Sequence, residues 1–344
     1  MRFRKLILVP TFVFALMGMS AWVAADGPVA DFPEYIPFSP YESPEGVAVD
    51  KVGNVYVSVN VPGHAELWKF TPTGEKTVLA QFPKAGVGLA VDATGNVYMA
   101  GTGGVYVVDQ EGVFAHLPGT EHINYADGLA FDRRGNLYIT DLVSLDNGPD
   151  SCMGTWGMGG IYRFPKGGAS AELWLRHELL TGSCTGILGY PAGANGIQFF
   201  RGALYVINSD KGTIVRIPVK PDGSPSEPTI WVTLEPVPGS VFEQVFPVMG
   251  DGFALDVHGN AFVAIVDQCA IVRINAHDMS QDTVALWPIV PLDTPTSIAF
   301  GTGKGGRTSI FVTNMGAMAA FGIPDPPGHS LIKIHVDAPG RPLP

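Results

Sequence analysis

Four polar side chains occupy equivalent points of a repeated sequence motif. Glu45, Asp127, Asn195 and Asp251 each directly precede a glycine and a short apolar run. Three carboxylates and an amide that met in one apolar-walled space would be unfavourable unless a cation lay among them. Oxygen ligands with no His or Cys suit Ca²⁺ rather than zinc. These residue types therefore predict a calcium site, provided that the fold brings the four positions together.

Acidic residues in such a chain can also do no more than cap turns, by accepting hydrogen bonds from nearby backbone N–H groups. That explanation suits the acids that precede the predicted hairpin turns at the other end of the motif, namely Asp50, Asp92, Asp132 and Asp256. It suits Glu45, Asn195 and Asp251 poorly. Their segments need no turn acid there, and the residue type changes while the position stays.

The repeated motif is first seen in residues 44–58, PEGVAVDKVGNVYVS. Two β-branched and aromatic runs flank a turn sequence, which predicts a hairpin of two buried strands, and further apolar runs supply a third and often a fourth strand. Six copies at intervals near 40 residues predict an all-β, six-bladed β-propeller, with longer loops at 141–160 and 177–194. The copies begin at Gly46, Gly88, Gly128, Gly196, Gly252 and Ser297.

The sixth copy lacks one strand. It supplies residues 297–300, 309–313 and 330–336 and then a proline-rich tail. We expect residues 34–38 to complete it, so that strands from both chain ends share the last blade and close the ring. The first strand of each blade lines the central channel of a propeller, which predicts that one channel end gathers Glu45, Val87, Asp127, Asn195, Asp251 and Thr296.

The N-terminus has the layout of a secretory signal peptide. Arg2, Arg4 and Lys5 precede an apolar run and the small pair Ala24-Ala25, which predicts cleavage after residue 25 and a single propeller domain over 26–344. An uncleaved membrane anchor is the alternative. We expect a secreted or periplasmic protein that has no contact with the membrane once the signal peptide is removed.

The charge and the cysteines limit the possible partners. The formal charge is −11, or −14 without residues 1–25, and so acidic a surface disfavours nucleic acid. We expect a monomer that acts on a small molecule. In an exported protein Cys152 and Cys184 could form a disulfide, whereas Cys269, in the apolar stretch 266–272, is expected to be buried.

The segments PEGVAVD, GANGIQF, GDGFALD and PTSIAFG resemble those of the SMP-30/gluconolactonase family and of squid-type diisopropyl fluorophosphatase. The likeness extends over residues 42–336. It implies that Glu45, Asn195 and Asp251 hold a catalytic calcium ion. The family often has Asn-Asp in the third blade, where this chain has Ala126-Asp127, and Asp127 could compensate as a ligand or as a polar contact to substrate.

The same resemblance implies a metal-dependent hydrolase that opens a lactone or a related ester. Asp251 is the candidate general base or nucleophile, Asp127 a second candidate catalytic group, and His64 a possible base because its unperturbed pKa lies near neutrality. Two other functions fit a propeller: a non-catalytic, NHL-like ligand-binding protein, and a lyase or condensing enzyme of the strictosidine-synthase-like type. The motifs of serine hydrolases, zinc proteases and Cys-x-x-Cys redox proteins are absent from the sequence.

Overall fold

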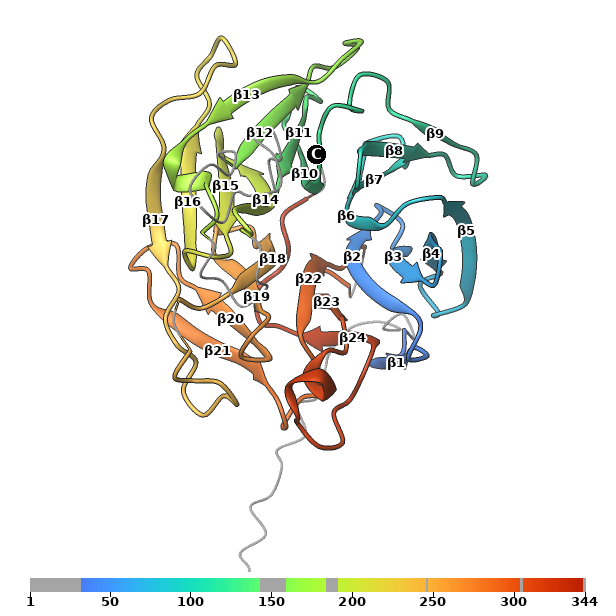
Figure 1. Cartoon of the computed structure of the whole chain (residues 1–344), viewed down its shortest axis with the longest axis vertical. Coiled ribbons are helices and arrows are strands. Elements are labelled where there is room, and N and C mark those ends of the chain that lie inside the picture. The colour runs from blue at the N-terminus through green and yellow to red at the C-terminus, as the bar shows by residue number, and fades with distance from the viewer. Residues whose placement is uncertain (1–31, 143–158, 184–190, 246, 304–305, 343–344) are drawn as a thin grey trace, which may run out of the picture.

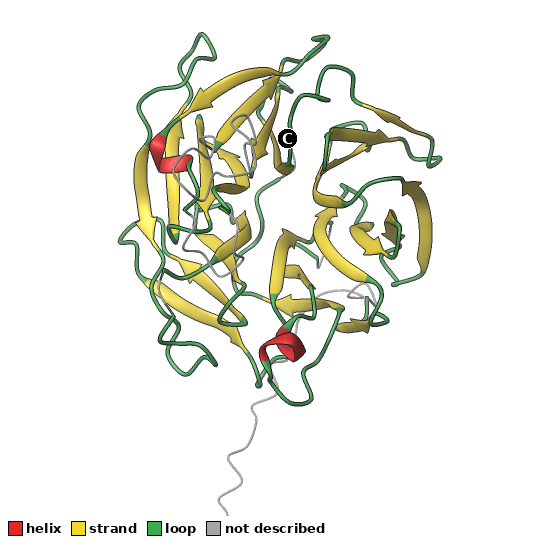
Figure 2. Cartoon of the chain, in the orientation of Figure 1, coloured by secondary structure: helices red, strands yellow, loops and turns green. Residues whose placement is uncertain are grey.

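Six four-stranded antiparallel sheets are arranged around a central axis in the computed structural model (Figures 1 and 2). The structure describes residues 32–142, 159–183, 191–245, 247–303 and 306–342. In five sheets the strands follow chain order from the axis outward. The prediction of a six-bladed β-propeller is confirmed.

The strands agree closely with the repeats expected from the sequence. The first blade contains β2 (Ser43–Val49), β3 (Val55–Val61), β4 (His64–Phe70) and β5 (Lys76–Phe82). The second contains β6 (Gly86–Val91), β7 (Val97–Gly101), β8 (Gly104–Val108) and β9 (Phe114–His116), and the third β10 (Ala126–Phe131), β11 (Leu137–Asp141), β12 (Gly160–Phe164) and β13 (Glu172–Arg176). The fourth contains β14 (Ala194–Phe200), β15 (Ala203–Asn208), β16 (Thr213–Pro218) and β17 (Thr229–Thr233), and the fifth β18 (Gly250–Leu255), β19 (Ala261–Ile265), β20 (Ala270–Ile274) and β21 (Gln281–Leu286).

The sixth blade joins the two ends of the chain. It contains β22 (Pro295–Phe300), β23 (Ser309–Asn314), β24 (Ser330–His335) and, outermost, β1 (Tyr35–Pro37). The N-terminal strand β1 pairs antiparallel with β24, and Tyr35 lies opposite Ile332. The predicted closure of the ring by strands from both chain ends is confirmed.

The turn acids have the role expected of them. The Asp50 carboxylate accepts hydrogen bonds from the backbone N–H of Val52 and of Asn54, at 3.0 and 2.9 Å. Gly53 adopts a φ of 94°, which a residue with a side chain rarely adopts. Asp92, Asp132 and Asp256 make the same contacts in their blades. These acids stabilise hairpins and are not part of the site.

Apolar side chains fill every interface between neighbouring blades. Each of the six buried clusters in the described residues draws on two adjacent blades, and the cluster that closes the ring combines Val57 and Trp68 of the first blade with Leu331 of the sixth. Burial between blades is the main stabilising contribution that a propeller can obtain. The inner strands are therefore fixed relative to one another, and with them the residues at the channel ends.

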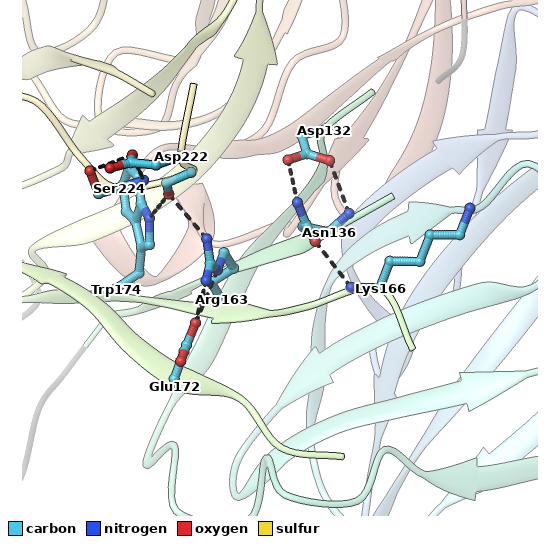
Figure 3. A network of polar contacts seen from close by, with 9 residues as sticks. Asp132, Asn136, Arg163, Lys166, Glu172, Trp174, Asp222 and Ser224 are labelled. Atoms are coloured by element: carbon cyan, nitrogen blue, oxygen red, sulfur yellow. Dashed lines mark hydrogen bonds and ion pairs between the residues drawn. The ribbon is translucent and has the colours of Figure 1, made fainter. Parts of the chain in front are cut away.

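Polar contacts at the rim join the third blade to the fourth (Figure 3). The Arg163 guanidinium donates to the carbonyl of Gly223 at 3.1 Å and pairs with Glu172, and the Trp174 indole donates to the same carbonyl at 2.8 Å. In the third blade itself, Asn136 donates to Asp132 and accepts from the backbone N–H of Lys166. The two blades that supply Asp127 and Asn195 are thus joined at their outer edge as well.

Several sequence predictions fall on residues outside the described ranges. These are the signal peptide in residues 1–25 and the pairing of Cys152 with Cys184. Cys269 is free and buried, as expected. The apolar stretch 266–272 is strand-like in sequence, but Cys269 occupies the turn between β19 and β20 with a φ of 47°. The described helices, η2 (Glu178–Leu180) and η3 (Met318–Phe321), are short 3-10 turns, and neither has the length or apolar character needed to span a membrane.

Candidate active site

The inner strand of each blade contains a β-bulge, and the candidate ligands lie in these bulges. In β2 the register with β3 shifts between Pro44 and Val47, which places Glu45 and Gly46 in the bulge. The same shift encloses Asp127 in β10, Asn195 in β14 and Asp251 in β18. A bulge re-aims side chains and interrupts pairing. The four residues therefore lie within the inner strands. The repeat motif, by contrast, predicts them directly before those strands.

The glycine after each of these residues allows neighbouring blades to approach closely. A Cβ atom on Gly46 would lie 2.2 Å from the carbonyl oxygen of Val87, and one on Gly196 would lie 2.4 Å from that of Asp251. No side chain fits at such distances without movement of the backbone. The contact recurs from blade to blade: Gly88 meets Asp127, Gly128 meets Asn195 and Gly252 meets Thr296.

Hydroxyl groups of the second strands connect the bulges of adjacent blades. Thr140 Oγ1 accepts a hydrogen bond from the N–H of Gly128 at 2.7 Å and donates to the carbonyl of Asn195 at 2.7 Å. Ser58 joins Gly46 to the carbonyl of Val87 in the same manner. These hydroxyls fix the backbone on which the candidate ligands stand.

In the sixth blade, two hydroxyls converge on the backbone of Glu45. Thr313 donates to the Glu45 carbonyl at 2.6 Å and Thr296 donates to it at 2.8 Å. Sequence reasoning missed these contacts. The signal was present, since the second run ends in Ser or Thr in three copies of the repeat, VYVS, LYIT and IFVT.

The four candidate residues line one cavity at the channel end, as predicted. The cavity has a volume of about 50 Å³, and Thr296 lines it too, whereas Val87 does not. Asp127, Asn195 and Asp251 are 6%, 5% and 8% exposed, and Glu45 is less deeply buried. A space of this size has room for an ion or a water molecule.

Burial raises the pKa of all three carboxylic acids, and repulsion from neighbouring acids contributes for Glu45 and Asp251. Burial raises the pKa of Glu45 well above its usual value, and the charges of Asp251 and Asp127 raise it further. Burial likewise raises the pKa of Asp251, with a contribution from Asp127 and an opposing one from a hydrogen bond with Asn195. Burial alone raises the pKa of Asp127 to about 7. Without a cation, this group of acids resists full ionisation at neutral pH.

The amide of Asn195 has an oxygen without a partner. Its Oδ1 is buried and accepts no hydrogen bond from any described residue. Such an atom calls for an explanation, and a cation in the cavity would satisfy it. In the described residues no three His, Cys, Asp or Glu side chains form a metal-binding group by themselves.

His64 does not line the cavity. It begins β4, the third strand of its blade, and its Nε2 lies 3.1 Å from Glu66 Oε1. The other contacts of Glu66 come from Trp68 and Gln81. The structure therefore brings together Glu45, Asp127, Asn195 and Asp251 and leaves His64 outside this group.

A family model described as the SMP-30/gluconolactonase/LRE-like region matches residues 64–315, more than two thirds of the chain. Asp127, Asn195 and Asp251 lie within the matched range, and Glu45 precedes it. A search of curated proteins gave no match.

Solved structures of low sequence identity share the fold. A luciferin-regenerating enzyme is 20% identical, with a TM-score of 0.63 over 88% of this chain and 94% of that one. A calcium-binding regucalcin from Agrobacterium tumefaciens is 19% identical, with a TM-score of 0.64 over 91% and 97%. A gluconolactonase from Xanthomonas campestris is 17% identical, with a TM-score of 0.60 over 87% and 86%. At these identities the likeness establishes the fold alone.

Proposed function

Because the chain belongs to the SMP-30/gluconolactonase/LRE-like family, we propose that it is an exported, calcium-dependent hydrolase that opens a lactone or a related ester at the carboxylate end of its channel. Membership of the family supports a lactonase-type hydrolase acting on a small molecule. The calcium ion, the residues that would bind it and the export of the protein are parts of our proposal that go beyond family membership.

One observation carries the proposal: two buried acids, the partly buried Glu45 and an amide with an unpartnered oxygen line the same small cavity. Buried charges are retained in proteins when they are paired or bind metals. Glu45, Asn195 and Asp251 would hold Ca²⁺, since all three present oxygen atoms. When bound, the ion would polarise the carbonyl oxygen of a substrate. The regucalcin that shares this fold is a calcium-binding protein, which agrees with this choice of metal.

The side chains themselves divide the remaining tasks. Asp251 is the candidate general base or nucleophile, and its hydrogen bond with Asn195 orients its carboxylate. Asp127, with a pKa of about 7, can hold or release a proton near neutral pH and so contact a polar group of the substrate. The hydroxyl of Thr140 and the paired hydroxyls of Thr296 and Thr313 hold the backbones of Asn195 and Glu45 in place.

The proposal of export rests on the sequence of residues 1–25, which has the basic start, apolar run and small-residue end of a signal peptide. Expression of the full chain and N-terminal sequencing of the mature protein test it. Asp26 as the first residue supports cleavage after Ala25, whereas retention of the apolar run in a membrane fraction supports an anchor.

The activity is tested with glucono-δ-lactone and a panel of γ-lactones, in the presence of calcium and after chelation. We expect the wild-type protein to hydrolyse at least one lactone and to lose this activity with the chelator. The Asp251→Asn variant should lose at least about a hundredfold in kcat, since removal of an acid–base group costs that much. The Asp222→Asn variant is the matched control, because Asp222 is exposed and binds only its own turn.

Activity that survives both the chelator and Asp251→Asn would contradict the proposal. Calcium binding without turnover of any lactone or ester would instead favour the non-catalytic ligand-binding propeller. Formation of a product by elimination would favour a lyase on this fold. Formation of a new carbon–carbon or carbon–nitrogen bond would favour a condensing enzyme.

A further inference from the structure

The C-terminal segment crosses the end of the channel that lies opposite the carboxylates. This segment, red in Figure 1, runs across the centre of the ring toward β10. The carbonyl of Pro339 accepts from the N–H of Val257 at 3.1 Å, and Gly340 donates to the carbonyl of Arg307 at 2.8 Å. Gly340 also packs tightly on the ring of Phe300, where a Cβ atom would lie 2.3 Å from the Phe300 side chain. The segment is therefore fixed to the fifth and sixth blades, and it carries Arg341 to the channel axis.

The Arg341 guanidinium has no charged partner among the described residues. It donates to the carbonyl of Phe199 and to Oε1 of Gln198, the latter at 2.7 Å, and both acceptors are neutral. A guanidinium has five N–H donors, so these contacts leave part of its capacity unused. Burial lowers the pKa of Arg341 to about 10. Arg341 is partly buried, and a cation withdrawn from water is costly unless an anion compensates it.

Arg341 lines a cavity at this end of the channel, and two further arginines border the same cavity. Arg201 lies at the tip of the β14–β15 hairpin with its guanidinium 4.8 Å from the centre of the Phe200 ring, and Arg133 lies in the β10–β11 turn. Arg163 and Arg273, by contrast, form ion pairs with Glu172 and Asp337. The cavity has a volume of about 430 Å³ and is lined by Phe131, Arg133, Phe199, Phe200, Arg201, Val257, Arg341 and Pro342.

The lining thus combines three arginines with aromatic and aliphatic side chains and includes no acid. In a chain of formal charge −11 this local excess of positive charge is unusual. Planar guanidinium groups match the geometry of carboxylate and phosphate oxygens. We propose that this cavity binds a small organic anion, whose carboxylate or phosphate contacts the three arginines while its apolar part packs on Phe131 and Phe200.

This site is separate from the proposed catalytic site. Asp127 lies near the start of β10 and Phe131 ends it, and Asn195 likewise lies near the start of β14, which Phe200 ends. The two ends are therefore about 13 to 17 Å apart along the strands, at about 3.3 Å per residue. Binding at the arginines does not depend on calcium or on lactone hydrolysis.

Titration calorimetry on the full chain with phenyl phosphate and with benzoate, in the presence of EDTA, tests this proposal. We expect one of these anions to saturate a single site, and the neutral analogue benzyl alcohol to give no binding. Arg341→Gln and Arg201→Gln should each weaken binding on the order of tenfold, which corresponds to loss of one charge-assisted contact. Lys84→Gln, an exposed cation in the β5–β6 loop, is the control and should bind as the wild type does.

Three results would overturn the proposal. The first is the absence of saturable binding of either anion at about 10 mM, below which even weak sites of this kind should fill. The second is binding that needs calcium, which would place the ligand at the carboxylates. The third is wild-type affinity in Arg201→Gln. The Arg201 variant is decisive if Arg341→Gln disturbs the C-terminal segment, because Arg201 is exposed at a hairpin tip and holds no other element in place.

Discussion

Thr140 Oγ1 donates a hydrogen bond to the backbone carbonyl of Asn195 at 2.7 Å, from the third blade to the fourth. The same hydroxyl accepts the N–H of Gly128 in the bulge that contains Asp127. One buried side chain thus connects the backbones of two candidate site residues. The site is built from contacts between blades, and its geometry depends on residues that do not touch the cavity.

Thr140→Val should weaken calcium binding by roughly fivefold, because it removes a buried hydrogen bond worth about 1 kcal/mol and leaves the Asn195 carbonyl without its donor. Calorimetric titration of calcium measures the change. Thr140→Ser keeps the hydroxyl and should restore most of the affinity, while Thr77→Val, on the exposed strand β5, should have no effect. Equal affinities for Thr140→Val and Thr140→Ser would show that the hydroxyl does not position Asn195.

Gly196→Ala should destabilise the fold by at least about 2 kcal/mol, since the new Cβ would lie 2.4 Å from the Asp251 carbonyl and overpacking of this kind costs 1–3 kcal/mol or more. Urea unfolding measures the change. Gly160→Ala is the control, because the nearest atom to its added Cβ lies at an ordinary 3.5 Å. A stability loss no greater than that of the control would mean that the blades can separate at this point without cost.

Asp267 should make the protein less stable as the pH rises from about 4 to about 8. The carboxylate is 8% exposed, its Oδ2 has no partner among the described residues, and burial raises its pKa to about 7. An acid with a raised pKa in the folded state favours folding when protonated, so its contribution is complete below pH 4 and is lost as the pH passes 7. The difference amounts to no more than about 4 kcal/mol, at 1.36 kcal/mol per pKa unit.

Asp267→Asn isolates this effect, because the amide stays neutral and can still accept from the N–H of Met249 as Asp267 does. The variant should match the wild type at pH 4 and exceed its free energy of unfolding at pH 8. A constant difference between the two proteins over this range would show that Asp267 does not titrate with a raised pKa.

Calcium should raise the melting temperature of the wild-type protein, and more at pH 8 than at pH 5. The pKa values of Glu45, Asp127 and Asp251 are raised, so calcium must displace protons at low pH and binds ionised ligands more readily at high pH. At a hundredfold excess over Kd the stabilisation is about 2.7 kcal/mol. Glu45→Gln should abolish most of the shift and Asp222→Asn none of it. A shift that is the same in both variants would place calcium elsewhere.

The sequence was sufficient for the fold and for the gathering of the candidate site because a single repeat period determines both. Once six hairpins form a ring, equivalent positions such as 45, 195 and 251 must meet at one channel end. Position in the repeat also separates Glu45 from the turn acid Asp50, five residues later, which lies at the opposite end of β2.

Other features depend on contacts between distant segments and could not be predicted. The Thr140 hydroxyl matters because of a carbonyl 55 residues away, and Arg341 reaches the axis because a tail without repeat character crosses the channel. His64 follows the β3–β4 loop, which lies at the same end of the first blade as Glu45. It stands on the third strand, away from the axis, and pairs with Glu66. The position of a residue within the repeat determines its height along the channel axis but not its distance from that axis.

The most direct test of the central claim is a crystal structure of the protein in millimolar calcium, with anomalous diffraction used to locate the ion. We predict one calcium ion in the channel, bound by carboxylate oxygens of Glu45 and Asp251 and by Oδ1 of Asn195 at about 2.3–2.6 Å. A map with no ion at these residues, or with an ion held only by other side chains, would contradict it.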